Sequence, residues 1–171
     1  MSSIKLVSAV LIVAVMSGCA SSVKREGSMS PHAAAVTKFS SANVTMTPEA
    51  QKKLADNIKF SQTELAATVM RTLEANQQVD KAATASLDIS ITDFRVRGTF
   101  SAVMFGVLAG TDSLEGTATA KDSAGNVLRK FSVSASYGLG GWGGGQDSAR
   151  LNWLYEDFAK KVSEELSNSK Q

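Results

Sequence analysis

The alternation of apolar and polar residues is clearest in the middle of the chain, where it predicts a long strand. Apolar residues occupy every second position from Leu87 to Ile91, and the phase then slips by one before Phe94. One extra residue reverses the face to which the following side chains point, so we expect a β-bulge at Thr92-Asp93.

Two further alternating runs, 114–121 and 131–137, lie on either side of the segment 122–126. That segment, Asp-Ser-Ala-Gly-Asn, is typical of a turn, so the two runs are expected to form a hairpin. The inward positions of the first run are glycine and alanine, which would let a helix approach the sheet closely.

A helical region is predicted between residues 48 and 76, after weaker strand signals over 36–46. Thr47-Pro48-Glu49 supplies a capping side chain, a proline at the first helical position and an acid near the positive helix end. The residues Ser61 to Glu64 form a capping box, after which apolar residues recur every fourth position. We therefore expect a broken or bent helix.

A last helix is expected to begin at Asp147 or Ser148, with an apolar stripe from Leu151 to Leu166. The predicted order is β-α-β-β-β-α. This order is typical of an α+β fold, an antiparallel sheet of about four strands with helices packed on one face.

The first residues resemble an export signal. Lys5 is followed by an apolar run, Leu6 to Val15, that is too short to span a bilayer. The residues Met16-Ser17-Gly18-Cys19 then resemble a lipobox, with methionine where leucine is more usual. We expect a signal peptide over 1–18, a lipidated cysteine and linker over 19–34, and one domain over 35–171.

Lipidation of Cys19 would anchor the mature chain, since each buried methylene adds about 0.8 kcal/mol. Ala20 and Ser21 follow, without an aspartate, which in Gram-negative lipoproteins resembles the sequence passed on to the outer membrane. We expect the periplasmic face of the outer membrane. The alternative is an ordinary secretory signal in which the cysteine has no role.

The segment 20–34 is polar, contains a glycine and a proline, and lacks periodicity. Such composition predicts a flexible spacer, long enough for the domain to search near the membrane without being pressed onto it. The chain's one histidine, His32, lies there and is expected to be a solvated side chain.

Composition excludes several classes of function. The 171 residues carry a formal net charge of +2, which becomes +1 once Lys5 leaves with the signal, too near neutral for general capture of nucleic acid. One cysteine and one histidine cannot form an internal disulfide or a zinc site of the usual kind. Composition alone leaves open a carboxylate site for calcium or magnesium, but no EF-hand-like spacing occurs. We expect no metal and no cofactor.

Residues 138–143 match the pattern G-x-G-x-x-G between a strand and a helix. No second strand follows the helix, and the segment lacks a phosphate-binding lysine, so no nucleotide is expected. The glycines are typical of a connecting loop. Within the loop, Trp142 either folds over the core or offers a contact for a partner, a sugar or an anion.

A second connector, 100–110, is almost entirely apolar. It either closes one end of the core or is exposed to a partner or lipid. If both connectors lie at one end of the sheet, that end is the best candidate for a partner surface, formed by Trp142, Met104, Phe105 and Leu108.

No catalytic set is visible, because the histidine has no structured setting and no nucleophile elbow occurs. The acidic pairs Glu156-Asp157 and Glu164-Glu165 stand beside lysines and are expected to be surface charge. The enzyme hypothesis would return only if Asp88, Asp93 and Glu115 converged in a pocket.

The lipobox, the LDISITDF strand, the LEGTATAKDSAGNVL hairpin and the glycine-rich turn together resemble an uncharacterised bacterial lipoprotein family, a domain of unknown function. The resemblance covers most of 36–167. The layout is also distantly similar to periplasmic domains of the curli-secretion lipoprotein and the Tol-system N-terminal domain. It implies work in envelope assembly and no enzymatic activity.

The leading hypothesis is a lipid-anchored binding or accessory module with an envelope protein partner. The alternative is a carrier or sensor of a small lipid or glycan, which needs an enclosed pocket of a few hundred Å³ between helix and sheet.

Overall fold

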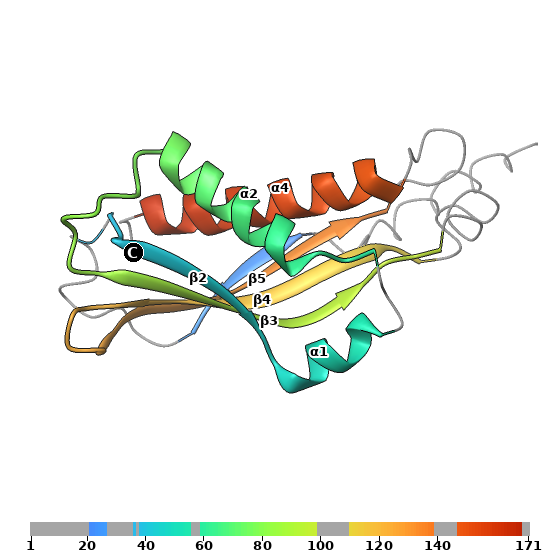
Figure 1. Ribbon diagram of the computed structural model, residues 1–171, viewed down its shortest axis with the longest axis horizontal. Coiled ribbons are helices and arrows are strands. Elements are labelled where there is room, and N and C mark those ends of the chain that lie inside the picture. Colours follow the sequence, from blue (N-terminus) through green and yellow to red (C-terminus); the bar gives the residue numbers. More distant parts are fainter. Residues whose placement is uncertain are drawn as a thin grey trace, which may run out of the picture.

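The computed structural model describes residues 21–26, 36, 38–55, 59–98, 110–138 and 147–168. A five-stranded sheet forms the centre of the domain (Figure 1). The elements are, in chain order, β1 (Ser22–Arg25), β2 (Ser41–Met46), α1 (Pro48–Leu54), α2 (Gln62–Ala75), β3 (Ser86–Arg95), β4 (Asp112–Lys121), β5 (Val127–Tyr137) and α4 (Asp147–Ser167).

The α+β class is confirmed, with differences in detail. The strand order is β1-β5-β4-β3-β2, which gives five strands instead of about four. Neighbouring strands are antiparallel except β2 and β3, which pair in parallel. Their parallel pairing follows from the connection between them, because α1 and α2 carry the chain back to the starting end of the sheet.

Helices α2 and α4 cover one face of the sheet, and α1 lies on its other side (Figure 1). The covered face holds the core, in which Leu65, Val69 and Leu73 of α2 are fully buried. The predicted close approach of a helix is confirmed at Gly116, where a Cβ atom would lie 3.0 Å from the Phe158 ring of α4. No described helix is long and apolar enough to cross a membrane.

The predicted break in the helical region is confirmed, and both predicted caps are present. The Thr47 side chain accepts a hydrogen bond from Ala50 N, and the Ser61 side chain accepts one from Glu64 N. In a complete capping box, the Glu64 side chain would accept a hydrogen bond from the backbone N–H of Ser61. Here Ser61 N donates instead to the Tyr155 hydroxyl of α4, at 2.8 Å. Helix α2 is thereby tied to α4 at its first turn.

The predicted bulge and hairpin are also confirmed. The register between β3 and β4 shifts between Ile91 and Asp93, and the shift returns Phe94 to the buried face. In the turn, the Asp122 carboxylate accepts hydrogen bonds from the backbone N–H groups of Ala124 and Asn126, both at 2.9 Å. Together with the Asn126 side chain, these bonds lower the pKa of Asp122.

Residues 22–25 of the predicted flexible spacer form strand β1 and pair antiparallel with β5, so the prediction is corrected for these four residues. All four residues are exposed, so the strand leaves no apolar periodicity in the sequence. Polar contacts hold it instead. Arg25 Nε lies 2.5 Å from the Glu165 carboxylate of α4, and Lys130 Nζ lies 2.8 Å from the Glu26 carboxylate.

Candidate functional site

The predicted partner residues Trp142, Met104, Phe105 and Leu108 lie outside the described residues, as do Cys19 and His32. The structure does place the residues that flank both connectors.

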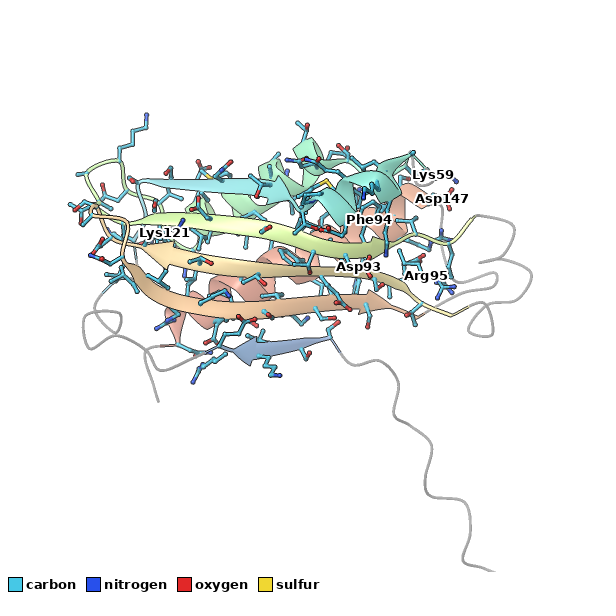
Figure 2. The ribbon with its side chains drawn as sticks, turned by 90° about the horizontal axis from the view of Figure 1, so that it is seen from below. Lys59, Asp93, Phe94, Arg95, Lys121 and Asp147 are labelled. Atoms are coloured by element: carbon cyan, nitrogen blue, oxygen red, sulfur yellow. The ribbon has the colours of Figure 1, made fainter. Side chains whose placement is uncertain are left out.

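The flanks of both connectors meet at one end of the sheet. Arg95 at the end of β3 pairs with Ser113, and Asp112 at the start of β4 pairs with Tyr137 at the end of β5. Figure 2 shows Arg95 and Asp147 at this end and Lys121 at the other. We call it the connector end.

A buried ionic cluster lies at the connector end. The Asp112 carboxylate accepts a hydrogen bond from Arg97 N at 2.7 Å and pairs with the Arg97 guanidinium at 3.0 Å. The guanidinium of Arg150, from the first turn of α4, approaches the same carboxylate at 3.1 Å. All three side chains are only 1% exposed, so water screens these charges little.

The cluster joins four segments of the chain. Arg97 donates from Nη1 to the Gly110 carbonyl at 2.7 Å and from Nη2 to the Tyr137 carbonyl at 3.3 Å. Arg150 donates to the Arg97 carbonyl at 2.9 Å and to the Asp147 carboxylate at 2.8 Å. The cluster therefore fixes the positions at which both connectors leave and re-enter the fold.

The charges of this cluster neutralise one another, with Arg97 and Arg150 set against Asp112 and Asp147. Lys59 adds an outer ion pair to Asp147. Because the central groups are buried and paired, the arrangement is suited to positioning the connectors and offers no accessible acid, base or nucleophile. The sequence did not predict this cluster, although Arg150 stands four residues before Leu154 on the apolar stripe of α4, a position that could have indicated burial.

The three carboxylates that would have revived the enzyme hypothesis do not converge. Asp88 pairs with Lys121 at 2.7 Å, whereas Asp93, nearer the connector end, pairs with Lys53 of α1. Glu115 is exposed beside Asp93 on the face away from α2 and α4. Among the described residues no group of three His, Cys, Asp or Glu side chains could hold a metal ion.

The described part of the chain has a polar groove, of about 630 Å³, on the outer side of the helical layer between α2 and α4. Its lining residues are Glu64, Ala67, Thr68, Arg71, Thr72, Asn152 and Glu156. This groove is open and polar, unlike the enclosed pocket between helix and sheet that the carrier hypothesis requires.

Glu165 corrects the prediction that the acidic pairs of the last helix are surface charge. Its side chain is only 7% exposed and forms two bonds with the Arg25 guanidinium, at 2.5 and 3.3 Å. These contacts raise the pKa of Arg25. Glu165 stands three residues after Val162 on the buried stripe, a position that could have indicated burial.

An aromatic pair lies beside the cluster at the connector end. The rings of Tyr137 and Trp153 are 5.1 Å apart, and Trp153 of α4 remains 41% exposed. Next to this pair, the Ser21 hydroxyl accepts a hydrogen bond from Ser136 N at 2.9 Å. The start of the described chain is therefore fixed at the connector end.

A family model described as a domain of unknown function (DUF4410) matches residues 20–141. This match confirms the resemblance to a family of unknown function, whereas the likeness to the curli-secretion and Tol-system domains stays a prediction. No curated protein matches the chain.

Among solved structures, a variant of the PelC dodecamer from Paraburkholderia phytofirmans is 13% identical, with a TM-score of 0.50, and the match covers 86% of this chain and 99% of that one. A minor lipoprotein from Acinetobacter baumannii is 15% identical, with a TM-score of 0.39 and coverage of 75% and 93%. At such identities the likeness to PelC shows a shared fold.

Proposed function

We propose that this chain, which belongs to the DUF4410 family, is a lipid-anchored lipoprotein of the outer membrane that binds another envelope component on the periplasmic side. The lipobox ending at Cys19 carries the proposal. The family match begins at residue 20, directly after Cys19.

The anchor is tested by Cys19→Ser in intact cells. We expect the precursor to keep its signal peptide and to disappear from the outer-membrane fraction, because the lipoprotein peptidase acts on a lipidated cysteine. Met16→Leu is the matched control, since it restores the more usual lipobox and should leave processing and fractionation intact. A Cys19→Ser protein that still matures and fractionates with the outer membrane would contradict the anchor.

The partner surface is proposed at the connector end, formed by Trp142, Met104, Phe105 and Leu108. The position of both connector flanks at this end supports the choice. Trp142→Ala and Phe105→Ala should abolish a partner that is captured by crosslinking in intact cells. Val127→Ala, at the opposite end and 52% exposed, should leave capture unchanged. Equal recovery from all three variants would place the interface elsewhere.

The proposed role is binding and not catalysis. Three of the described carboxylates at the connector end are held in ion pairs: Asp112 with two arginines, Asp147 with Arg150 and Lys59, and Asp93 with Lys53. The fourth, Glu115, is exposed beside Asp93. The buried Asp112–Arg97 pair holds the backbone where the two connectors leave and re-enter the fold, and this supports a binding role.

A further inference from the structure

The direction of β1 determines where a lipid anchor leaves the domain. Strand β1 runs antiparallel to β5, with Ser22 opposite Ser134 and Arg25 opposite Phe131. The chain before Ser22 therefore points toward the end of β5, where Ser21 Oγ accepts the hydrogen bond from Ser136 N. This is the connector end.

The distance from this point to the anchor is short. Cys19 precedes Ser21 by two residues, and consecutive Cα atoms are 3.8 Å apart, so the two Cα atoms are separated by at most about 8 Å. The backbone pairing of β1 with β5, the Arg25–Glu165 pair and the Glu26–Lys130 pair hold the strand in place. A lipid on Cys19 would thus hold the connector end at the membrane, with almost no spacer.

The surface beside this point suits a lipid–water interface. Trp153 is one of three exposed large apolar residues among those described, and the other two, Val23 and Val127, are aliphatic. Its ring lies against Tyr137, the last residue of β5. Tryptophan and tyrosine favour the headgroup level, where one edge of the ring is apolar and the other is hydrated.

We propose that the domain stands on the bilayer on its connector end, with Trp153 at the headgroup level and the 122–126 turn pointing away from the membrane. The proposal rests on the lipid anchor proposed above. In this arrangement the domain has a fixed orientation on the membrane, whereas a flexible spacer would let it rotate and move freely. The sheet then stands upright, and a partner of the connector end must itself lie at or in the same membrane.

Orientation is measurable by energy transfer from a single tryptophan to dansyl-labelled headgroups. The mature lipoprotein is purified in detergent and reconstituted into phosphatidylethanolamine–phosphatidylglycerol vesicles containing a small fraction of dansyl-phosphatidylethanolamine. Trp142→Phe leaves Trp153 as the reporter. The matched control is Trp142→Phe, Trp153→Phe, Val127→Trp, in which the reporter stands at the exposed far end of β5.

We expect transfer from Trp153 to exceed transfer from the Val127→Trp reporter about threefold or more, because the 11 residues of β5 span about 37 Å. A ten-residue Gly-Ser insertion between Ala20 and Ser21 should reduce transfer from Trp153 toward the control value. Equal transfer from the two reporters, or an insertion without effect, would overturn the orientation while the anchor stands. Protein that does not float with the vesicles would overturn the anchor itself, and the orientation with it.

Discussion

Replacing Asp112 by asparagine removes the one negative charge that lies between two buried guanidinium groups. The side chain keeps its size and can still accept the hydrogen bond from Arg97 N, so the change is mainly electrostatic. Breaking a buried ion pair from one side costs about 3–5 kcal/mol, because the remaining charges stay uncompensated in a medium that screens them poorly. That is a large share of the 5–15 kcal/mol by which a domain is usually stable.

The measurement is chemical denaturation of a soluble form that begins at residue 20, followed by circular dichroism. Asp112→Asn should lower the free energy of unfolding by about 3–5 kcal/mol and Tm by roughly 6–20 °C. Asp93→Asn is the matched control, because its pair with Lys53 has side chains 47% and 49% exposed. Such a surface pair contributes about 1 kcal/mol or less.

A second variant separates charge from shape. In Asp112→Asn, Arg97 loses its carboxylate partner and Arg150 keeps only Asp147. Adding Arg150→Met removes one of these two buried cations, so the double variant should be more stable than the sum of the single losses predicts. If Asp112→Asn loses no more stability than the Asp93→Asn control, the buried charges do not hold the connector end together and the reasoning fails.

Three further predictions concern the packing of the helices and of β1. Gly116→Ala should lower the free energy of unfolding by about 1–3 kcal/mol, because the new methyl group would lie 3.0 Å from the Phe158 ring of α4. Gly98→Ala is the control, since a methyl group there meets nothing within 4 Å. Equal stability of the two variants in thermal melts would contradict the close approach. Burial raises the pKa of Tyr155 to about 12. The unfolded chain, with its ordinary tyrosine pKa of about 10, therefore loses this proton first, and stability should fall between about pH 10 and 12. Tyr155→Phe should remove that part of the pH dependence, and an unchanged profile would show that another group causes it. Glu165→Gln should speed amide hydrogen exchange in β1, because it removes the charge that pairs with Arg25. Glu164→Gln, at an exposed site, should leave the exchange rates of β1 unchanged. The same rates in both variants would mean that backbone pairing alone holds the strand.

Local patterns were sufficient for most of the fold. The caps at Thr47 and Ser61 act within one helical turn, and the slip before Phe94 is a property of a single strand. Each of these signals is complete within a few neighbouring residues, so the sequence shows it directly. The same holds for the turn at Asp122, whose side chain bonds to its own segment.

Only part of the candidate site could be predicted from the sequence. Both connectors were recognised from their composition, but the cluster beneath them draws on residues from distant parts of the chain. Arg97 and Asp112 are 15 residues apart, and Arg150 is 53 residues from Arg97. The period of the apolar residues does not predict these contacts, because charge pairing between distant elements depends on how the helices and strands are packed.

By itself, the sequence determined the α+β class, the starts of the helices, the bulge and the hairpin, because local hydrogen bonds and the period of the apolar residues decide each of them. Only the tertiary structure decided that residues 22–25 form an edge strand, that β2 and β3 run in parallel, and that Glu165 is buried. An exposed edge strand has no apolar face to display. Its backbone finds a partner more than 100 residues away, and such a partner exists only once the sheet has formed.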